Sequence, residues 1–470
     1  MAQSRANLSS LAITIVLLFS IVAIFIFQIG LQGRAIAPEI PKGADLAVIG
    51  GTTAALLAAL EGAEQGAQVV LFLNGQEPGE DTSYLVKGGL AAPHVSPRNE
   101  LEMEFTPEKL AEMIREHGGV INDPLLLNAF RESSGSLFSW VDEFEGLYFD
   151  FLPDPQSKPY YHLASPYGDL LFKKQLIDRI NKSPIVVIDN LRVEDILLSP
   201  NGDVQALLLE NEQSEKITYY FRAVIIADGG SSGDIHYWQD YLPRENLLVL
   251  RPEQKGYGLK LAYRLGADIV QMGFFHQSPL LYEPVSKEHV VLPLLPWQDT
   301  YLLNTNGQIL TWSESSPRDV LYLIHHTLPG STYILAPEER VFSYLSFFKR
   351  FEELDDLLKV YPLDDPLPIQ GLTMQAPYYL APLSAGIEYT LGGISVTPRG
   401  EVKKDGNVIK GLYAAGEIVG GLHGEALLPG MALSETFFTA KVAGQFAAEY
   451  AQYWPNLVTF PNQDAPQDNS

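Results

Sequence analysis

Cysteine is absent from the 470 residues, and that absence excludes several kinds of site at once. Without thiols the chain forms no disulfide, no cysteine-ligated zinc site, no cysteine-held iron–sulfur cluster and no thiol nucleophile. Basic residues are also scarce, because 32 Lys and Arg stand against 57 Asp and Glu, for a net charge of −25. Nucleic-acid binding requires clustered positive charge, so no nucleic-acid partner is expected. The nine histidines show no HExxH or comparable spacing, so no metal site is predicted.

One long apolar run lies near the start of the chain. Residues 11–31 are almost wholly apolar, with Gln28 as the one strongly polar side chain, and about 20 such residues suffice for a helix to cross a bilayer. We therefore predict a membrane anchor within residues 1–36. The alternative is a cleaved signal peptide, but its candidate cleavage site, Ala35-Ile36-Ala37, is followed by Pro38, which is a poor context for cleavage.

The charges that flank this run give only a weak orientation. Arg5 and the amino terminus lie before it, and Arg34 and Lys42 lie after it. No twin-arginine pair is present to export a prefolded cofactor protein. We therefore expect a single-pass membrane protein whose globular part lies on the cytoplasmic side.

The segment that follows has the pattern of a nucleotide-binding unit. Residues 45–50 read DLAVIG, residues 51–68 are rich in Ala and Leu and suit a helix, and residues 69–73, VVLFL, suit a strand. Strand, glycine turn, helix and strand within about 30 residues form the βαβ unit of dinucleotide-binding folds. The predicted fold class is therefore α/β with a Rossmann-like domain.

Two later segments repeat the combination of an apolar strand and a glycine turn. Residues 223–230 read AVIIADGG, and residues 411–417, GLYAAGE, precede a glycine-rich loop and a helical run at 432–451. Because these pieces are far apart in sequence, we expect one domain that is interrupted by an insertion. The last residues, 456–470, have the composition of a disordered tail.

The first glycine turn reads GGTTAA. Gly50 suits the tight turn, and the helix that follows would direct its N-terminus at phosphate oxygens. Gly51 and Thr52 come next, and the Thr52 side chain narrows the place where backbone approaches a diphosphate. Asn74 stands near the end of the second strand, where an acid usually binds ribose hydroxyls. These four residues are candidate nucleotide contacts, although such a turn can also be purely structural.

Several distant segments together resemble one flavoprotein family, that of succinate dehydrogenase, fumarate reductase and L-aspartate oxidase. DTSYLVKGGLAA is similar to the family's flavin loop ending in QGGIAA, and EYTLGGISV is similar to HYTMGGI. GLYAAGEIVGGLHGEALLPGMALSET resembles the block GLYAAGE, GLHGANRL and NSL. Three more matches lie in the family's order: AVIIADGG, KGYGLKLAYRLGADIVQMGFF and PRDV. The resemblance covers most of the chain after residue 44.

The resemblance implies a large FAD-binding domain and an α+β cap inserted into it. The implied divisions are 44–279 for the first part of the FAD-binding domain, 280–376 for the cap and 377–455 for the second part. Since the family's covalent-flavin histidine corresponds to Thr82, the implied FAD is noncovalent. The resemblance implies that Glu417 accepts from sugar hydroxyls of the cofactor. It carries flavin contacts over to Gly50, Ser83, Gly88, Gly89, Gly229, Gly230, Glu417 and Ser434.

The positions that would bind a dicarboxylate differ from the family. The clamp histidine corresponds to Glu388, the clamp arginine to Leu427, and another family histidine to Ser278. Two substrate carboxylates require positive groups, whereas a buried unpaired like charge costs several kcal/mol, of order 3–5. Succinate, fumarate and aspartate are therefore not expected as substrates.

The family's proton-donating arginine is retained as Arg318. The acid and arginine that relay protons to it correspond to Pro293 and Pro296, so that relay is absent. We hypothesise that Arg318 pairs with Glu388 in a new acid/base pair. The alternative is an ordinary ion pair of Arg318 with Asp319 or another acid.

Tyrosines add a further candidate. Tyr378 and Tyr379 occupy a segment that lines the flavin face in related enzymes, and Tyr379 is the candidate that could take or give a proton. A packed aromatic with a satisfied hydroxyl is the ordinary alternative. His276 is a further candidate, with a structural role as its alternative.

Three functional hypotheses follow. The first is a membrane-anchored FAD oxidoreductase that transfers hydride at flavin N5 to or from a less polar substrate, with an unidentified electron partner. The second is a noncatalytic accessory or assembly protein of a membrane complex, favoured by Thr52, by Asp228 in place of a family threonine, and by the lost relay. The third is a soluble secreted flavoprotein released by signal cleavage.

Overall fold

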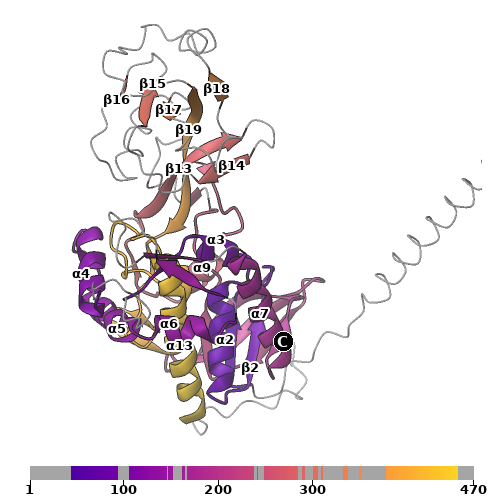
Figure 1. Ribbon diagram of the computed structural model, residues 1–470. Coiled ribbons are helices and arrows are strands. Elements are labelled where there is room, and N and C mark those ends of the chain that lie inside the picture. Colours follow the sequence, from indigo (N-terminus) through magenta and orange to yellow (C-terminus); the bar gives the residue numbers. More distant parts are fainter. Residues whose placement is uncertain are drawn as a thin grey trace, which may run out of the picture.

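The computed structural model describes most of the chain between Ala44 and Tyr453 (Figure 1). The described residues are 44–93, 105–145, 147–151, 161–164, 167–234, 236–237, 241, 248–283, 288–291, 300–304, 309–310, 332–336, 349–351 and 377–453. Within this part no helix is both long enough and apolar enough to cross a membrane. The predicted anchor at 11–31 and the predicted tail lie outside the described residues.

A six-stranded sheet forms the centre of the main body, in the order β21-β22-β10-β1-β2-β6. Its strands pair in parallel except at β21 and β22. The strands β1, β2 and β10 are buried along their whole length, which fits their uninterrupted apolar sequences. The bounds are β1 Leu46–Ile49, β2 Val69–Phe72, β6 Val186–Ile188, β10 Ala223–Ile226, β21 Glu401–Lys404 and β22 Asn407–Ala414. The predicted α/β, Rossmann-like fold class is confirmed.

Two helices from opposite ends of the chain pack together against this sheet (Figure 1). The helix α2, Thr53–Glu64, is rich in Ala and Leu and is buried over most of its length. The helix α13, Met431–Tyr453, crosses it closely at Gly444, where a Cβ atom would lie 2.7 Å from the Ala58 carbonyl oxygen. The flavin-loop segment and the C-terminal glycine loop meet at Ala91, whose N–H donates to the Gly430 carbonyl.

The remaining elements of the main body surround these two layers. The helices are α3 Thr82–Lys87, α4 Pro107–His117, α5 Pro124–Ser134, α6 Leu137–Asp142, α7 Gly168–Lys182, α9 Tyr257–Arg264 and the short η2 Gly416–Ile418. One small sheet has the order β3-β5-β4 and another the order β7-β8-β9. Their bounds are β3 Leu90–Ala91, β4 Phe149–Phe151, β5 Tyr161–Ala164, β7 Leu191–Leu198, β8 Val204–Asn211 and β9 Lys216–Tyr220.

A second, eight-stranded sheet extends from one end of the main body (Figure 1). Its centre is β19, Tyr378–Thr390, which pairs with four other strands. The others are β11 Leu248–Val249, β13 Phe275–Glu283, β14 Glu288–Val291, β15 Tyr301–Asn304, β16 Ile309–Leu310, β17 Thr332–Ala336 and β18 Lys349–Phe351. The pair β12 Ile269–Val270 and β20 Gly393–Ile394 lies where the chain leaves and re-enters the main body. The predicted cap boundaries at 280 and 376 stay predictions.

Candidate functional site

The turn between β1 and α2 brings two backbone segments into close contact. Gly50 has a φ of 129°, and a Cβ atom there would lie 2.4 Å from the carbonyl oxygen of Ala227. Thr52 caps α2, because its Oγ1 accepts from the Ala55 N–H at 3.2 Å and donates to the Ala227 carbonyl at 2.6 Å. The Thr52 hydroxyl is therefore committed to the fold rather than directed at a ligand.

Side chains of the chain itself occupy other donors at the same turn. The Gly51 N–H donates to Oε1 of Gln76 at 2.7 Å, and the Gln76 amide donates onward to the Asp228 carbonyl at 2.9 Å. The N–H and the hydroxyl of Thr53 both donate to Oδ1 of Asp81, each at 2.7 Å. A carboxylate thus lies against the positive N-terminal end of α2.

Several buried polar atoms after β10 have no hydrogen-bond partner among the described residues. Asp228 accepts from the Gly258 N–H at 2.6 Å through Oδ2, but its Oδ1 has no partner. The side-chain amide nitrogen and oxygen of the fully buried Gln254 also lack a partner in the described residues, as does the hydroxyl of Ser232. Burial raises the pKa of Asp228 to about 7. Unpaired buried polar groups are costly, so this cluster has the character of a ligand site.

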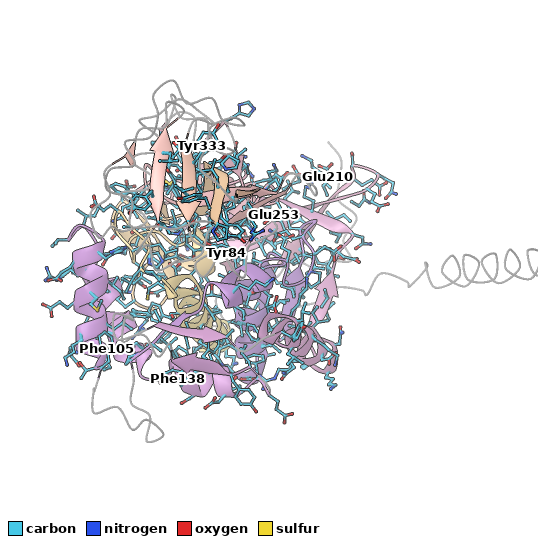
Figure 2. All side chains as sticks on the ribbon, turned by 45° about the horizontal axis from the view of Figure 1, so that its top comes forward. Tyr84, Phe105, Phe138, Glu210, Glu253 and Tyr333 are labelled. Atoms are coloured by element: carbon cyan, nitrogen blue, oxygen red, sulfur yellow. The ribbon has the colours of Figure 1, made fainter. Side chains whose placement is uncertain are left out.

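A buried ion pair lies close to these atoms. Arg251 contacts Oε2 of Glu417 at 2.5 Å, and the other Glu417 oxygen accepts from the N–H and the hydroxyl of Thr390. Tyr84 and Glu253, both labelled in Figure 2, flank the guanidinium, whose central carbon lies 4.7 Å from the centre of the Tyr84 ring. Although burial opposes it, the Glu417 carboxylate raises the pKa of Arg251, which therefore stays charged.

A second acidic cluster joins β13 and β19. Glu388 is 5% exposed, and its Oε2 accepts from the Ser278 hydroxyl at 2.5 Å. The Nε2 atom of His276 lies 3.5 Å from the same oxygen. Burial raises the pKa of Glu388 to about 7, against the opposing effects of Ser278 and Arg251. Because burial lowers the pKa of His276, the carboxyl rather than the imidazole holds a proton just below neutral pH.

A third cluster joins β19, the glycine-rich loop and α13. Oε2 of Glu435 accepts from the Tyr389 hydroxyl at 2.5 Å and lies 2.8 Å from Nε2 of His423. All three side chains are almost fully buried, and the Tyr389 ring stacks near that of Tyr84. The other Glu435 oxygen and Nδ1 of His423 have no partner in the described part of the chain.

Three of the predicted cofactor contacts use their side chains within the protein. Oδ1 of Asn74 accepts from the Val193 N–H at 2.9 Å, although the position was predicted to reach a ribose. The Ser83 hydroxyl donates to Asp169 at 2.7 Å. The buried Ser434 hydroxyl donates to the carbonyl oxygen of Ala91 at 2.7 Å and thereby ties α13 to β3. Four further predicted contacts are glycines that follow α3 or β10: Gly88, Gly89, Gly229 and Gly230.

Of the other two predicted catalytic residues, only Tyr379 lies in the described part of the chain, and it is distant from Glu388. Tyr379 is buried on the same strand, but it lies nine residues before Glu388. At about 3.3 Å per residue, the two are roughly 30 Å apart. Arg318 lies outside the described residues, so its pairing with Glu388 stays a hypothesis. In the described residues Glu388 instead contacts Ser278 and His276.

Two positions where the chain differs from the family are buried. Leu427, at the place of the family's clamp arginine, is only 7% exposed and belongs to the main apolar core. Thr82, at the place of the covalent-flavin histidine, has a fully buried hydroxyl 2.8 Å from that of Thr53. The sequence reasoning missed Arg251, Gln76 and Asp81, because their partners are distant in sequence or belong to no motif.

Comparison with known proteins identifies the family. The sequence matches the FAD binding domain family over residues 45–433. The chain belongs to this family. The match includes the turn before α2, the segment after β10 and the start of α13, which are the parts of the site described above. The family and its relatives indicate FAD as the cofactor.

Similar proteins show how far the likeness extends. The NADH:fumarate oxidoreductase of Klebsiella pneumoniae is 23% identical over 88% of this chain, which spans 48% of that relative's length. A flavocytochrome c3 fumarate reductase has the same fold, with a TM-score of 0.74, 20% identity, and coverage of 90% of this chain and 81% of its own. A 3-ketosteroid-Δ4-(5α)-dehydrogenase from Rhodococcus jostii aligns with a TM-score of 0.68, 18% identity, and coverage of 88% and 99%.

The residues present fit a dinucleotide such as FAD in polar character. The Gly50 turn and the N-terminus of α2 provide the place for a diphosphate. The unpaired atoms of Asp228, Ser232 and Gln254 provide buried donors and acceptors for the rest of the cofactor. Glu417 and the N-terminus of α13 complete the predicted flavin side. Within the described residues no cluster of His, Asp and Glu is placed to hold a metal ion.

The buried carboxyls predict a pH dependence of stability before any ligand is added. Burial raises the pKa of Asp228 and Glu388 to about 7, so the folded protein binds more protons than the unfolded chain between pH 5 and 7. The free energy of unfolding should therefore fall as pH rises through this window, by up to about 1.4 kcal/mol per unit for each fully buried group. Thermal melting from pH 5 to 8 measures this. A melting temperature that rises over the same interval would contradict the assignment.

Proposed function

We propose that this protein is a membrane-anchored FAD-dependent oxidoreductase whose substrate is apolar rather than a small dicarboxylate. The observation that carries the proposal is the buried Glu388 carboxyl beside Ser278 and His276. Leu427 supports it, because an alkyl chain replaces the positive charge that a substrate carboxylate would need. The ketosteroid dehydrogenase of the same fold was solved with 4-androstene-3,17-dione, an apolar ketone, which supports the proposed substrate class.

Glu388 is the group that transfers the proton in the proposed reaction. When bound, FAD supplies hydride transfer at N5. Glu388 holds a proton below about pH 7, and Ser278 fixes the carboxyl through a hydrogen bond to Oε2. In the reducing direction Glu388 donates this proton to the substrate, and in the oxidising direction it accepts one. Arg251 stays bound to Glu417 and fixes the position of that carboxylate.

The location in the cell is part of the same proposal. Residues 11–31 would form a single transmembrane helix, with the FAD-binding domain on the cytoplasmic side. An apolar substrate partitions into the bilayer, so an anchor would keep the enzyme where its substrate is concentrated. The mass of the mature chain distinguishes an uncleaved anchor from a cleaved signal peptide, because signal cleavage would remove about 35 residues.

The function is tested on the full chain, purified in mild detergent and denatured to release cofactor. We expect FAD near one equivalent per chain, and reduction of α,β-unsaturated apolar ketones by the dithionite-reduced protein. Fumarate and succinate should give rates at background, since Glu388 and Leu427 replace the positive groups that bind their carboxylates. Turnover of fumarate with a saturable rate would overturn the substrate class.

A noncatalytic accessory protein is the second candidate function. The specific observation in its favour is that Gln76 and Asp81 occupy donors at the N-terminus of α2. If this accessory protein has lost the cofactor, the purified chain would be colourless and would bind no added FAD. If it keeps FAD, the reduced protein would turn over no substrate. The FAD content and the turnover together therefore separate the two candidates.

A further inference from the structure

The donors that face a cofactor diphosphate are already occupied within the chain. Among the N–H groups of the turn, those of Gly51, Thr53 and Ala55 donate to the side chains of Gln76, Asp81 and Thr52, respectively. A diphosphate at this turn needs such N–H groups and the positive end of the helix. The cofactor and these side chains therefore compete for the same donors.

Asp81 is the strongest of the three competitors. It is the only one of them with a negative charge, and it receives two bonds of 2.7 Å from Thr53. It is 7% exposed, so water screens its charge poorly. Gln76 is neutral and only partly buried, and Thr52 forms a regular helix cap.

The segment that carries Asp81 and Gln76 is the loop that packs on the turn before α2. It connects β2 to α3, and Gly75 and Gly79 within it have φ values of 83° and 64°. The Gly79 N–H donates to the Gly51 carbonyl at 2.6 Å, which holds the loop against the turn. Opening of the loop would break this backbone bond and the bonds of Gln76 and Asp81 to the turn.

We propose that Asp81 is an internal substitute for the cofactor diphosphate and thereby sets the affinity of this protein for FAD. In the free protein its carboxylate neutralises the end of α2. When FAD binds, the 75–81 loop withdraws and the diphosphate takes the Thr53 and Gly51 donors. This inference rests on the proposed FAD binding. It implies that the protein without FAD stays folded, because Asp81 takes the place of the diphosphate.

The test uses the full chain without cofactor and the substitution Asp81→Asn. Asparagine keeps an oxygen for the Thr53 bonds but removes the charge that opposes a diphosphate. We expect the Kd for FAD and for ADP, measured by calorimetry, to fall by about tenfold or more. The Kd for adenosine, which has no phosphate, should stay within about twofold, because the charge effect acts through phosphate. Gln76→Ala should give a smaller change in the same direction.

Asp45→Asn is the matched control. Asp45 immediately precedes β1, at the end of that strand remote from the Gly50 turn, and it pairs with Arg222. Asp45→Asn removes this ion pair, so it should lower the melting temperature and leave the Kd for FAD unchanged. An unchanged or weaker FAD affinity in Asp81→Asn would overturn the inference while leaving the oxidoreductase proposal in place. If neither the wild type nor Asp81→Asn binds FAD, the proposed function fails together with the inference.

Discussion

Replacing Glu388 with glutamine is expected to lower the rate of substrate reduction by about 10²–10⁴-fold while FAD stays bound. Glutamine keeps the size of the side chain and an oxygen for the Ser278 hydroxyl, but it carries no proton to donate. The measurement is single-turnover oxidation of the dithionite-reduced protein by its substrate, followed by flavin absorbance. A released-FAD assay on the same sample shows that the cofactor site is intact.

The pH profile makes this prediction specific to proton transfer. Because the raised pKa of Glu388 is about 7, the wild-type rate of reduction should be high below pH 7 and fall above it. The fall should be absent in Glu388→Gln, and Glu388→Asp should retain part of it. Wild-type rates in the glutamine variant would remove Glu388 from the mechanism. They would direct attention to Arg318 and Tyr379 as the remaining candidates.

Replacing Arg251 with methionine is expected to lower the free energy of unfolding by about 3–5 kcal/mol. The side chains of Arg251 and Glu417 are 6% and 5% exposed, so the substitution leaves a buried carboxylate without its partner. Denaturant unfolding of the chain without cofactor measures the change. A double variant, Arg251→Met with Glu417→Gln, should lose less than the single variant, because no charge is left unpaired.

An exposed pair provides the matched control for this prediction. Arg131 contacts Glu108 at 3.0 Å, but their side chains are 33% and 64% exposed. Arg131→Met should therefore cost far less stability than Arg251→Met. If the two arginine variants cost the same, the Arg251–Glu417 pair does not behave as a buried one.

The parts of the fold that were predictable from sequence are those with local signals. The apolar runs of β1 and β2 and the Ala-rich α2 are adjacent, so the βαβ unit could be predicted before any tertiary contact was known. The resemblance gave the order of the later pieces. The β19 strand was harder to foresee, because Pro382 and Gly386 interrupt its sequence and normally argue against a central strand. Its continuity is what separates Tyr379 from Glu388.

The site was less predictable, because its contacts join residues that no local pattern connects. Arg251 and Glu417 are 166 residues apart, and Gln76 and Asp228 are 152 apart. The motifs predicted the glycines and Glu417, whose backbone positions follow from the turns. Side-chain partners such as Asp81 with Thr53 depend on how a loop closes over a helix end, and a motif carries no information about that.

The packing of α2 against α13 has a consequence for how the protein is made. The helices are separated by more than 350 residues, yet Gly444 lets them touch backbone to backbone. Contacts that are so distant in sequence form slowly, because the entropy of closing the loop must be met first. During synthesis β1, β2 and α2 therefore leave the ribosome long before α13 can cover them. We expect the nascent chain to need a chaperone until its last helix has emerged.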